Sequence, residues 1–211
     1  PCTVRFEDFQ YESGTPVITW TIGIEAGDHG NVSTQDGGTV VDGEPGGTAG
    51  QVEVVDGEDQ TFVVDPDTGY VVDQVLVDGN PGSLTGGEYT FENVQADHTD
   101  PVGLSVAFAL TTNNIAATAG AGGSITPSGG VSVDYGADQT FTVAPDTGYE
   151  VEALLADGIT ATLTGGQYTF GNVTENHTID VTFRPQVFTI TVTAGENGTI
   201  DPGTDQDVNY G

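Results

Sequence analysis

Three histidines are the first side chains to consider for chemistry, because imidazole can act as a general base or a zinc ligand near neutral pH. They are His29, His98 and His177. His98 and His177 are 79 residues apart, and the sequences around them match at the same spacing. A single catalytic centre would need no duplicate, so the spacing predicts a structural role for these two imidazoles. His29 lies in a glycine-containing turn, and we expect neither zinc binding nor catalysis from any of the three.

Carboxylates gather in the turns of the first half of the chain. Calcium takes six to eight oxygen ligands, which adjacent turns could supply from side chains and carbonyls. The candidate ligands are Asp56, Glu58, Asp59, Asp65 and Asp67. No EF-hand sequence is present, and a turn Asp commonly accepts hydrogen bonds from its own backbone. Calcium binding and plain turn formation are therefore the two interpretations of these residues.

Four asparagines and one cysteine are candidates for covalent modification. The asparagines fit the acceptor pattern for N-glycosylation, and they are Asn31, Asn172, Asn176 and Asn197. Chance matches are common in a chain rich in Thr, although an exposed β surface is a natural carrier of glycans. Cys2 is the only cysteine, so no intrachain disulfide can form. An intermolecular disulfide, a free thiol and no role at all stay open for it.

The charge of the chain excludes several classes of function. Its 211 residues hold 32 Asp and Glu against two Lys and Arg, which gives a formal net charge of −30. Such a surface repels the phosphates of nucleic acids and anionic lipids, so we expect neither as a partner. The longest nearly apolar run, residues 102–110, is too short for a membrane span. Screening by salt or divalent cations would relieve the self-repulsion, which favours a halophilic or cation-rich setting.

The sequence also lacks the motifs of common enzymes. Both basic residues are arginines, so a Schiff-base lysine and a phosphate-loop lysine are excluded. No nucleophile elbow is present, and no carboxylate pair stands out from the general acidity. We therefore expect that the chain is not an enzyme.

An internal repeat is the main organising feature. Residues 65–70 recur at 144–149, and residues 85–91 recur at 164–170, both with the 79-residue spacing. We expect an N-terminal extension at 1–16, repeat 1 at 17–111 and repeat 2 at 112–186, with the start of an incomplete third repeat at 187–211. Repeat 1 carries an insertion near 35–50 and about four extra residues near 100–103. Residues 3–6 read like the closing strand of a preceding repeat. A fragment of a longer array and a subunit whose ends are completed by neighbours are both consistent with this pattern.

The pattern within repeat 2 predicts an all-β fold. Apolar residues alternate along 131–135, 140–143 and 179–183, which places Phe141, Val143 and Val181 inside. Gly and Pro-Asp-Thr-Gly turns separate the runs. We expect tandem small β domains of about six short strands each, either a β-sandwich or β-grasp-like. One helical turn at 151–156 is an alternative to a strand there.

These motifs resemble the divergent InlB B-repeat family. The resemblance rests on Ala-Gly-x-Gly-Gly-Ser-Ile-Thr-Pro at 119–127, on residues 133–149, and on Tyr168-Thr-Phe-x-Asn-Val followed by His177. It covers nearly all of residues 17–211. The family occurs in tandem in secreted and surface proteins of bacteria and archaea. The resemblance thus implies a compact β module outside the cell without enzymatic activity.

Together these features predict a structural protein at the cell surface. We expect a segment or subunit of a filament, sheath or adhesin stalk, with copies of itself or neighbouring repeats as partners through strand edges. The alternative is a carbohydrate-binding or protein-binding accessory module of a secreted enzyme. Trp20 is the only Trp and lies in an alternating run, so we expect it in the core rather than as a platform for sugars.

Overall fold

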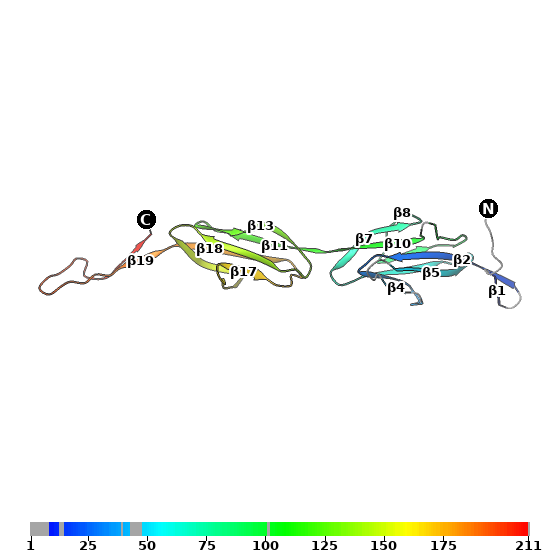
Figure 1. Cartoon of the computed structure of the whole chain (residues 1–211), viewed down its shortest axis with the longest axis horizontal. Coiled ribbons are helices and arrows are strands. Elements are labelled where there is room, and N and C mark those ends of the chain that lie inside the picture. The colour runs from blue at the N-terminus through cyan, green and yellow to red at the C-terminus, as the bar shows by residue number, and fades with distance from the viewer. Residues whose placement is uncertain (1–8, 13–14, 39, 43–47, 101, 211) are drawn as a thin grey trace. The chain divides into compact units, whose positions relative to one another are not determined.

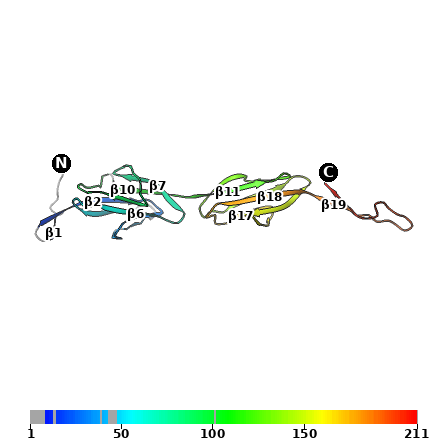
Figure 2. The same cartoon turned by 180° about the vertical axis from the view of Figure 1, so that it is seen from behind.

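A computed structural model describes residues 9–12, 15–38, 40–42, 48–100 and 102–210 (Figure 1). The chain divides into two compact units, Pro1–Thr111, which contains repeat 1, and Thr112–Gly211, which contains repeat 2. Every regular element within the described ranges is a β-strand, so the all-β prediction is confirmed (Figure 2). No helix in these ranges is long and apolar enough to cross a bilayer.

Repeat 2 is built from two sheets. The larger sheet has the strand order β13-β11-β18-β15-β16, in which β11 and β18 are parallel and the other neighbours are antiparallel. The smaller sheet has the order β12-β14-β17 and is antiparallel. The strands are β11 Thr112–Ala119, β12 Gly123–Thr126, β13 Gly129–Asp134, β14 Gln139–Pro145, β15 Tyr149–Ala156, β16 Ile159–Thr160, β17 Gln167–Phe170 and β18 His177–Pro185.

Side chains from both sheets of repeat 2 meet in one hydrophobic core, as in a sandwich. Phe141 from the small sheet and Ile115 and Ile179 from the large sheet are fully buried. The alternation along β14 and β18 turns every second residue inward, which confirms the predicted burial of Phe141, Val143 and Val181. The helical alternative for residues 151–156 is wrong, because they belong to β15, which pairs with β18.

Repeat 1 has the same architecture with two additional strands. Its larger sheet has the order β1-β2-β10-β7-β8 with β5 on β2, and its smaller sheet has the order β4-β3-β6-β9. Phe62, Ile22 and Leu104 are fully buried in its own core. The strands are β1 Phe9–Glu12, β2 Thr15–Ala26, β3 Gly30–Thr34, β4 Val40–Asp42, β5 Thr48–Val55, β6 Gln60–Pro66, β7 Tyr70–Val77, β8 Asn80–Pro81, β9 Glu88–Phe91 and β10 Leu104–Leu110.

The insertion in repeat 1 supplies β4, which covers one edge of the small sheet. β4 pairs antiparallel with β3, with Val41 opposite Val32. In repeat 2 the strand that corresponds to β3 is β12, and only Pro127 and Ser128 connect it to β13. β12 therefore has one described strand neighbour, β14, whereas β3 has two.

Left-handed backbone at equivalent turns explains part of the repeated sequence. Asp78 has φ 47° and Asp157 has φ 52°, and each is followed by a glycine with positive φ. Two successive residues with positive φ form the tight hairpin that joins β7 to β8 and β15 to β16. Asp and Gly are the residues that tolerate this conformation best, so the Asp-Gly pairs are required by the turn.

Residues 187–210 form a hairpin that repeats the first pairing of repeat 2. β19 Val187–Ile190 pairs antiparallel with β20 Gln206–Asn209, and Val187 lies opposite Asn209. Thr112 lies opposite Asp134 in the same manner 75 residues earlier. The third copy of the sequence pattern therefore adopts the β11–β13 register.

Candidate functional site

Each repeat holds one histidine against one aspartate and one phenylalanine. His98 Nδ1 lies 2.8 Å from Asp78 Oδ2, and His177 Nδ1 lies 2.8 Å from Asp157 Oδ2. The aspartates come from the hairpin turns, and each imidazole also lies 4.7 Å between ring centroids from Phe91 or Phe170. The same three-residue cluster thus ties the β15–β16 turn to the start of β18 in repeat 2, and the β7–β8 turn to the segment that precedes β10 in repeat 1.

The surroundings of Asp157 lower the pKa of its carboxyl group. Partial burial alone would raise that pKa, but the Thr178 N–H at 2.8 Å, the hydrogen bond to His177 and the charge of His177 outweigh it. In repeat 1, burial raises the pKa of Tyr89, and the charge of Asp78 adds to the effect. The lowered pKa of Asp157 thus reflects its hydrogen bonds to Thr178 and His177.

The described contacts of His98 and His177 do not form a nucleophile–His–Asp triad. Within the described residues, neither His98 nor His177 is hydrogen-bonded to a Ser, Thr or Cys side chain. An Asp–His pair without a nucleophile can orient an imidazole and anchor a turn. The placement of His98 and His177 is therefore consistent with the structural role predicted from their spacing.

His29 occupies a position in repeat 1 that Gly122 occupies in repeat 2. Both residues have positive φ, 72° for His29 and 96° for Gly122. The imidazole of His29 stacks on Tyr70 at 4.1 Å between ring centroids and lies 4.0 Å from Asp67. An added side chain at Gly122 would collide with Tyr149, the equivalent of Tyr70. The two repeats therefore pack the same aromatic position with different partners.

The predicted calcium ligands fall into two groups at opposite ends of β6. Asp56, Glu58 and Asp59 precede the strand, whereas Asp65 is near its end and Asp67 follows it. A seven-residue strand separates its ends by about 20 Å, so one ion cannot contact both groups. Asp56 Oδ1 accepts a hydrogen bond from the Trp20 indole N–H at 2.8 Å, and Asp59 Oδ1 accepts one from the Asn93 N–H at 2.7 Å.

Among the described residues, no group of three or more His, Cys, Asp or Glu is arranged to hold a metal ion. Calcium binding therefore stays a prediction, and its candidate ligands lie in turns. Asp59 has an exact counterpart in Asp138, which accepts a hydrogen bond from the Asn172 N–H at 2.7 Å. This recurrence is typical of turn formation.

The candidate glycosylation sites differ in their surroundings. Asn31 lies inside β3, opposite Asp42 and Asp65 in the neighbouring strands. Asn172, Asn176 and Asn197 are exposed, and the first and last have positive φ. The Asn176 Oδ1 accepts a hydrogen bond from the Asn114 N–H at 2.7 Å. Cys2 lies outside the described residues.

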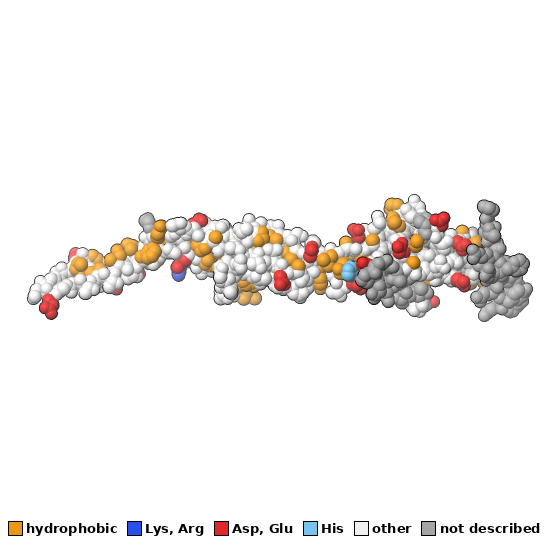
Figure 3. Space-filling view, viewed as in Figure 1, with side chains coloured by type: hydrophobic (Ala, Val, Ile, Leu, Met, Phe, Trp, Pro, Cys, Tyr) orange, Lys and Arg blue, Asp and Glu red, His pale blue; other side chains and the backbone are white. Residues whose placement is uncertain are grey.

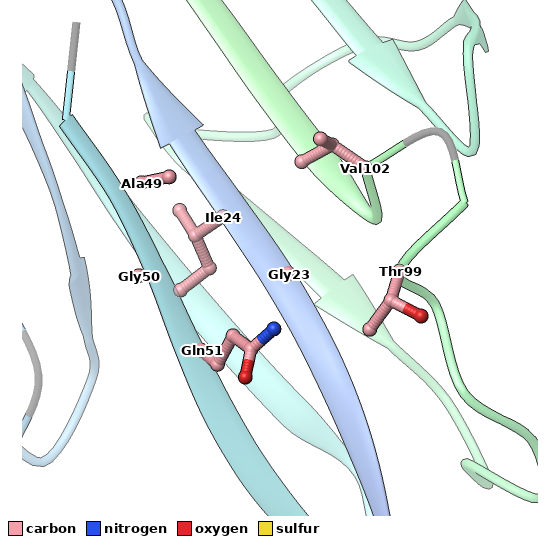
Figure 4. A pocket seen from close by; sticks show the side chains of 7 residues that line it. All are labelled: Gly23, Ile24, Ala49, Gly50, Gln51, Thr99 and Val102. Atoms are coloured by element: carbon pink, nitrogen blue, oxygen red, sulfur yellow. The ribbon is translucent and has the colours of Figure 1, made fainter.

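A shallow cleft of about 410 Å³ lies on the large sheet of repeat 1 (Figure 4). Gly23 and Gly50 leave the backbone of β2 and β5 without side chains there, while Gln51, Thr99 and Val102 form the walls. Thr99 precedes the extra residues near 100–103 and Val102 is one of them, so the cleft depends on a feature that repeat 2 lacks. No single position in the sequence indicates this cleft, because it requires β2, β5 and the loop to converge.

Trp20 does not line this cleft. Its side chain packs against the core of repeat 1, while its indole N–H is bonded to Asp56. This placement agrees with the expectation that Trp20 serves the core.

Comparison with known proteins identifies repeat 2. Residues 113–186 match the sequence family described as the divergent InlB B-repeat domain. No curated protein matches the chain. The match suggests a surface-associated repeat module. Residues 113–186, which contain the two sheets, the shared core and the Asp157–His177 pair described above, therefore form a divergent InlB B-repeat domain.

Proposed function

We propose that this chain is a non-enzymatic structural part of an assembly at the cell surface, such as a filament, a sheath or an adhesin stalk. The observation that carries the proposal is the duplication of its polar contacts. Asp78–His98 and Asp157–His177 are equivalent, and so are the hydroxyl pairs Thr61–Thr90 and Thr140–Thr169, both at 2.8 Å. Contacts that recur in every repeat serve the architecture of the module, whereas a reaction needs one distinct site.

The charge supports a salty or cation-rich medium. A net charge of −30 destabilises the compact state unless counterions screen it. The exposed acceptor residues Asn172 and Asn197 are compatible with glycosylation of such a surface.

Protease treatment of intact cells of the source organism tests the location. Peptides from this chain should be released before cell lysis, while peptides from a cytosolic marker should not. Release of this chain only together with the marker would refute an extracellular role. Electron microscopy of the released material then tests for regular assemblies.

A second function is favoured by the cleft in repeat 1, which would suit a carbohydrate-binding or protein-binding accessory module. Its uncharged lining, with Gln51 and Thr99 as hydrogen-bonding groups, fits a neutral ligand such as a glycan. Binding to a glycan array that is lost in Gln51→Ala with Thr99→Ala, and kept in Trp20→Phe, would establish this function. Equal binding by all three proteins would refute the cleft as the site.

A further inference from the structure

The small sheet of repeat 2 carries no charged residue, although the chain holds 32 Asp and Glu. None of β12, β14 or β17 contains Asp, Glu, Lys or Arg. The equivalent sheet of repeat 1 contains Asp42, Asp65 and Glu88. Across whole repeats, residues 17–111 hold 17 Asp and Glu, and residues 112–186 hold eight. Few acidic side chains cover the side of repeat 2 seen in Figure 3.

The outer face of this small sheet consists mainly of hydroxyl and amide groups, with the methyl group of Ala144 among them. The exposed positions alternate with buried ones along each strand. Thr140 and Thr169 share a hydrogen bond across β14 and β17, and Gln167 donates to Thr142. The exposed polar residues are Ser124, Thr126, Thr140, Thr142, Gln167 and Thr169. A second molecule can approach this face without bringing carboxylates together.

The edge of the sheet at β12 is open within the described residues. In repeat 1 the equivalent edge, at β3, is paired with another strand. There, the inserted strand β4 pairs antiparallel with β3 over three residue pairs. The equivalent residues of β12 are Ser124, Ile125 and Thr126. Natural proteins protect strand edges by charges or by a covering segment. β12 carries no charge, and no strand corresponding to β4 is present in repeat 2.

We propose that β12 is a self-association edge, at which it pairs antiparallel with β12 of a second copy of this chain. Ile125 of the two copies would lie opposite each other, with Ser124 opposite Thr126, as Val32 lies opposite Val41 in repeat 1. The pair joins two small sheets into one sheet of six strands. The inference deepens the proposed function, on which it rests, by naming the contact that joins neighbouring modules.

Such a contact is weak in solution and is strengthened by salt. It buries few residues, so a single pair dissociates readily, whereas repeated modules in an assembly add their contacts. The eight carboxylates of repeat 2 repel those of the second copy, and molar salt screens this repulsion. The carboxylate next to the start of β12 belongs to Asp146, whose backbone N–H donates to the Gly122 carbonyl. The two-fold pair therefore has one Asp146 at each end of the paired β12 strands.

Sedimentation of the full chain tests the proposal at protein concentrations from about 10 μM to about 1 mM. The wild-type chain should form a dimer in 1 M NaCl, and dilute buffer should weaken it. Ser124→Asp with Thr126→Asp should weaken it at least tenfold, because four carboxylates then meet at the edge. Ser132→Asp with Thr160→Asp adds the same charge to the edge strands β13 and β16 and should leave the dimer intact. A wild-type chain that stays monomeric, or a control that dissociates as much, overturns the proposal.

Cysteine crosslinking tests the register without relying on the charged variants. In a Cys2→Ser background, one chain carries Ser124→Cys and another carries Thr126→Cys. Directly opposed residues of antiparallel strands lie within disulfide reach, so oxidation of the mixture should give crosslinked dimers several times faster than either chain alone. Equal rates in all three samples overturn the β12 pair. Release of the chain from intact cells does not depend on β12, so the proposed function can stand when this inference fails.

Discussion

The Asp157–His177 pair offers a direct test of what the duplicated polar clusters contribute. Asp157→Asn removes the negative charge, keeps an oxygen for the Thr178 N–H, and suits the φ of 52° because Asn tolerates left-handed backbone. A hydrogen bond to a charged group contributes about 1.5–3 kcal/mol in a protected site. The Asp157 side chain is 45% exposed, so solvent screening reduces the expected loss to about 1 kcal/mol at pH 7.

The pH dependence of this loss has a definite sign. The folded state lowers the pKa of Asp157 below its ordinary value of 3.8. Its contribution to stability is therefore complete above pH 3.8 and disappears as the pH falls through the folded-state pKa. The free-energy difference between the wild-type chain and Asp157→Asn should therefore shrink as the pH is lowered below 3.8.

Urea unfolding followed by circular dichroism measures this difference. It is carried out at one pH above and one pH below the isoelectric point of about 4.1. Trp20 is the only Trp and lies in repeat 1, so its fluorescence reports that repeat separately and should not change. Glu175→Gln removes one exposed charge two residues before His177 and serves as the matched control. An equal loss in that control, or a loss from Asp157→Asn that is the same at both pH values, would refute the assigned role of the pair.

Three further outcomes follow from the fold. Trp20→Phe should lower the free energy of unfolding of repeat 1 by about 1 kcal/mol, since Asp56 loses its hydrogen bond from the indole N–H. An unchanged midpoint of urea unfolding would contradict this prediction. Phe141→Ala should lower the free energy of unfolding of repeat 2 by about 3–5 kcal/mol, because Phe141 is fully buried. Thr142→Ala should lower it by less than about 0.5 kcal/mol, because Thr142 is exposed. Similar losses in the two variants would contradict the assigned core. The melting temperature should rise between dilute buffer and molar NaCl, and a flat profile in scanning calorimetry would rule out self-repulsion as a main destabilising force.

The alternation of apolar residues was sufficient to predict the strands of the core. Phe141, Val143 and Val181 point inward because a strand turns every second side chain to the same face. The same rule could not decide residues 151–156, where Val, Leu and Ala suit either a helical turn or a buried strand. Pairing with β18 decides in favour of the strand, and pairing is a tertiary property.

The sequence predicted the histidines of the polar clusters but not their aspartate partners. The 79-residue spacing indicated that His98 and His177 are equivalent and structural, but it could not name Asp78 and Asp157 as their partners. Those aspartates lie 20 residues earlier in the chain. They reach the imidazoles because the hairpin turn lies beside the start of β18 in repeat 2, and beside the segment before β10 in repeat 1. This proximity requires the strand order of the sheet. The cleft of repeat 1 escaped prediction for a similar reason, since glycines contribute to it by lacking side chains.

The two repeats treat the same sheet edge in opposite ways, and this difference bears on how an acidic array could hold together. Repeat 1 has both common protections at this sheet, a covering strand and carboxylates on the strands. Repeat 2 has neither, although a single Asp at Ser124 or Thr126 would cost little in a solvent-exposed position. Within residues 17–186 only repeat 2 has an open edge of this kind, so these two repeats together form one such contact with a second copy. Open edges in both repeats would instead let association continue without limit, and light scattering that grows without saturation would identify that outcome.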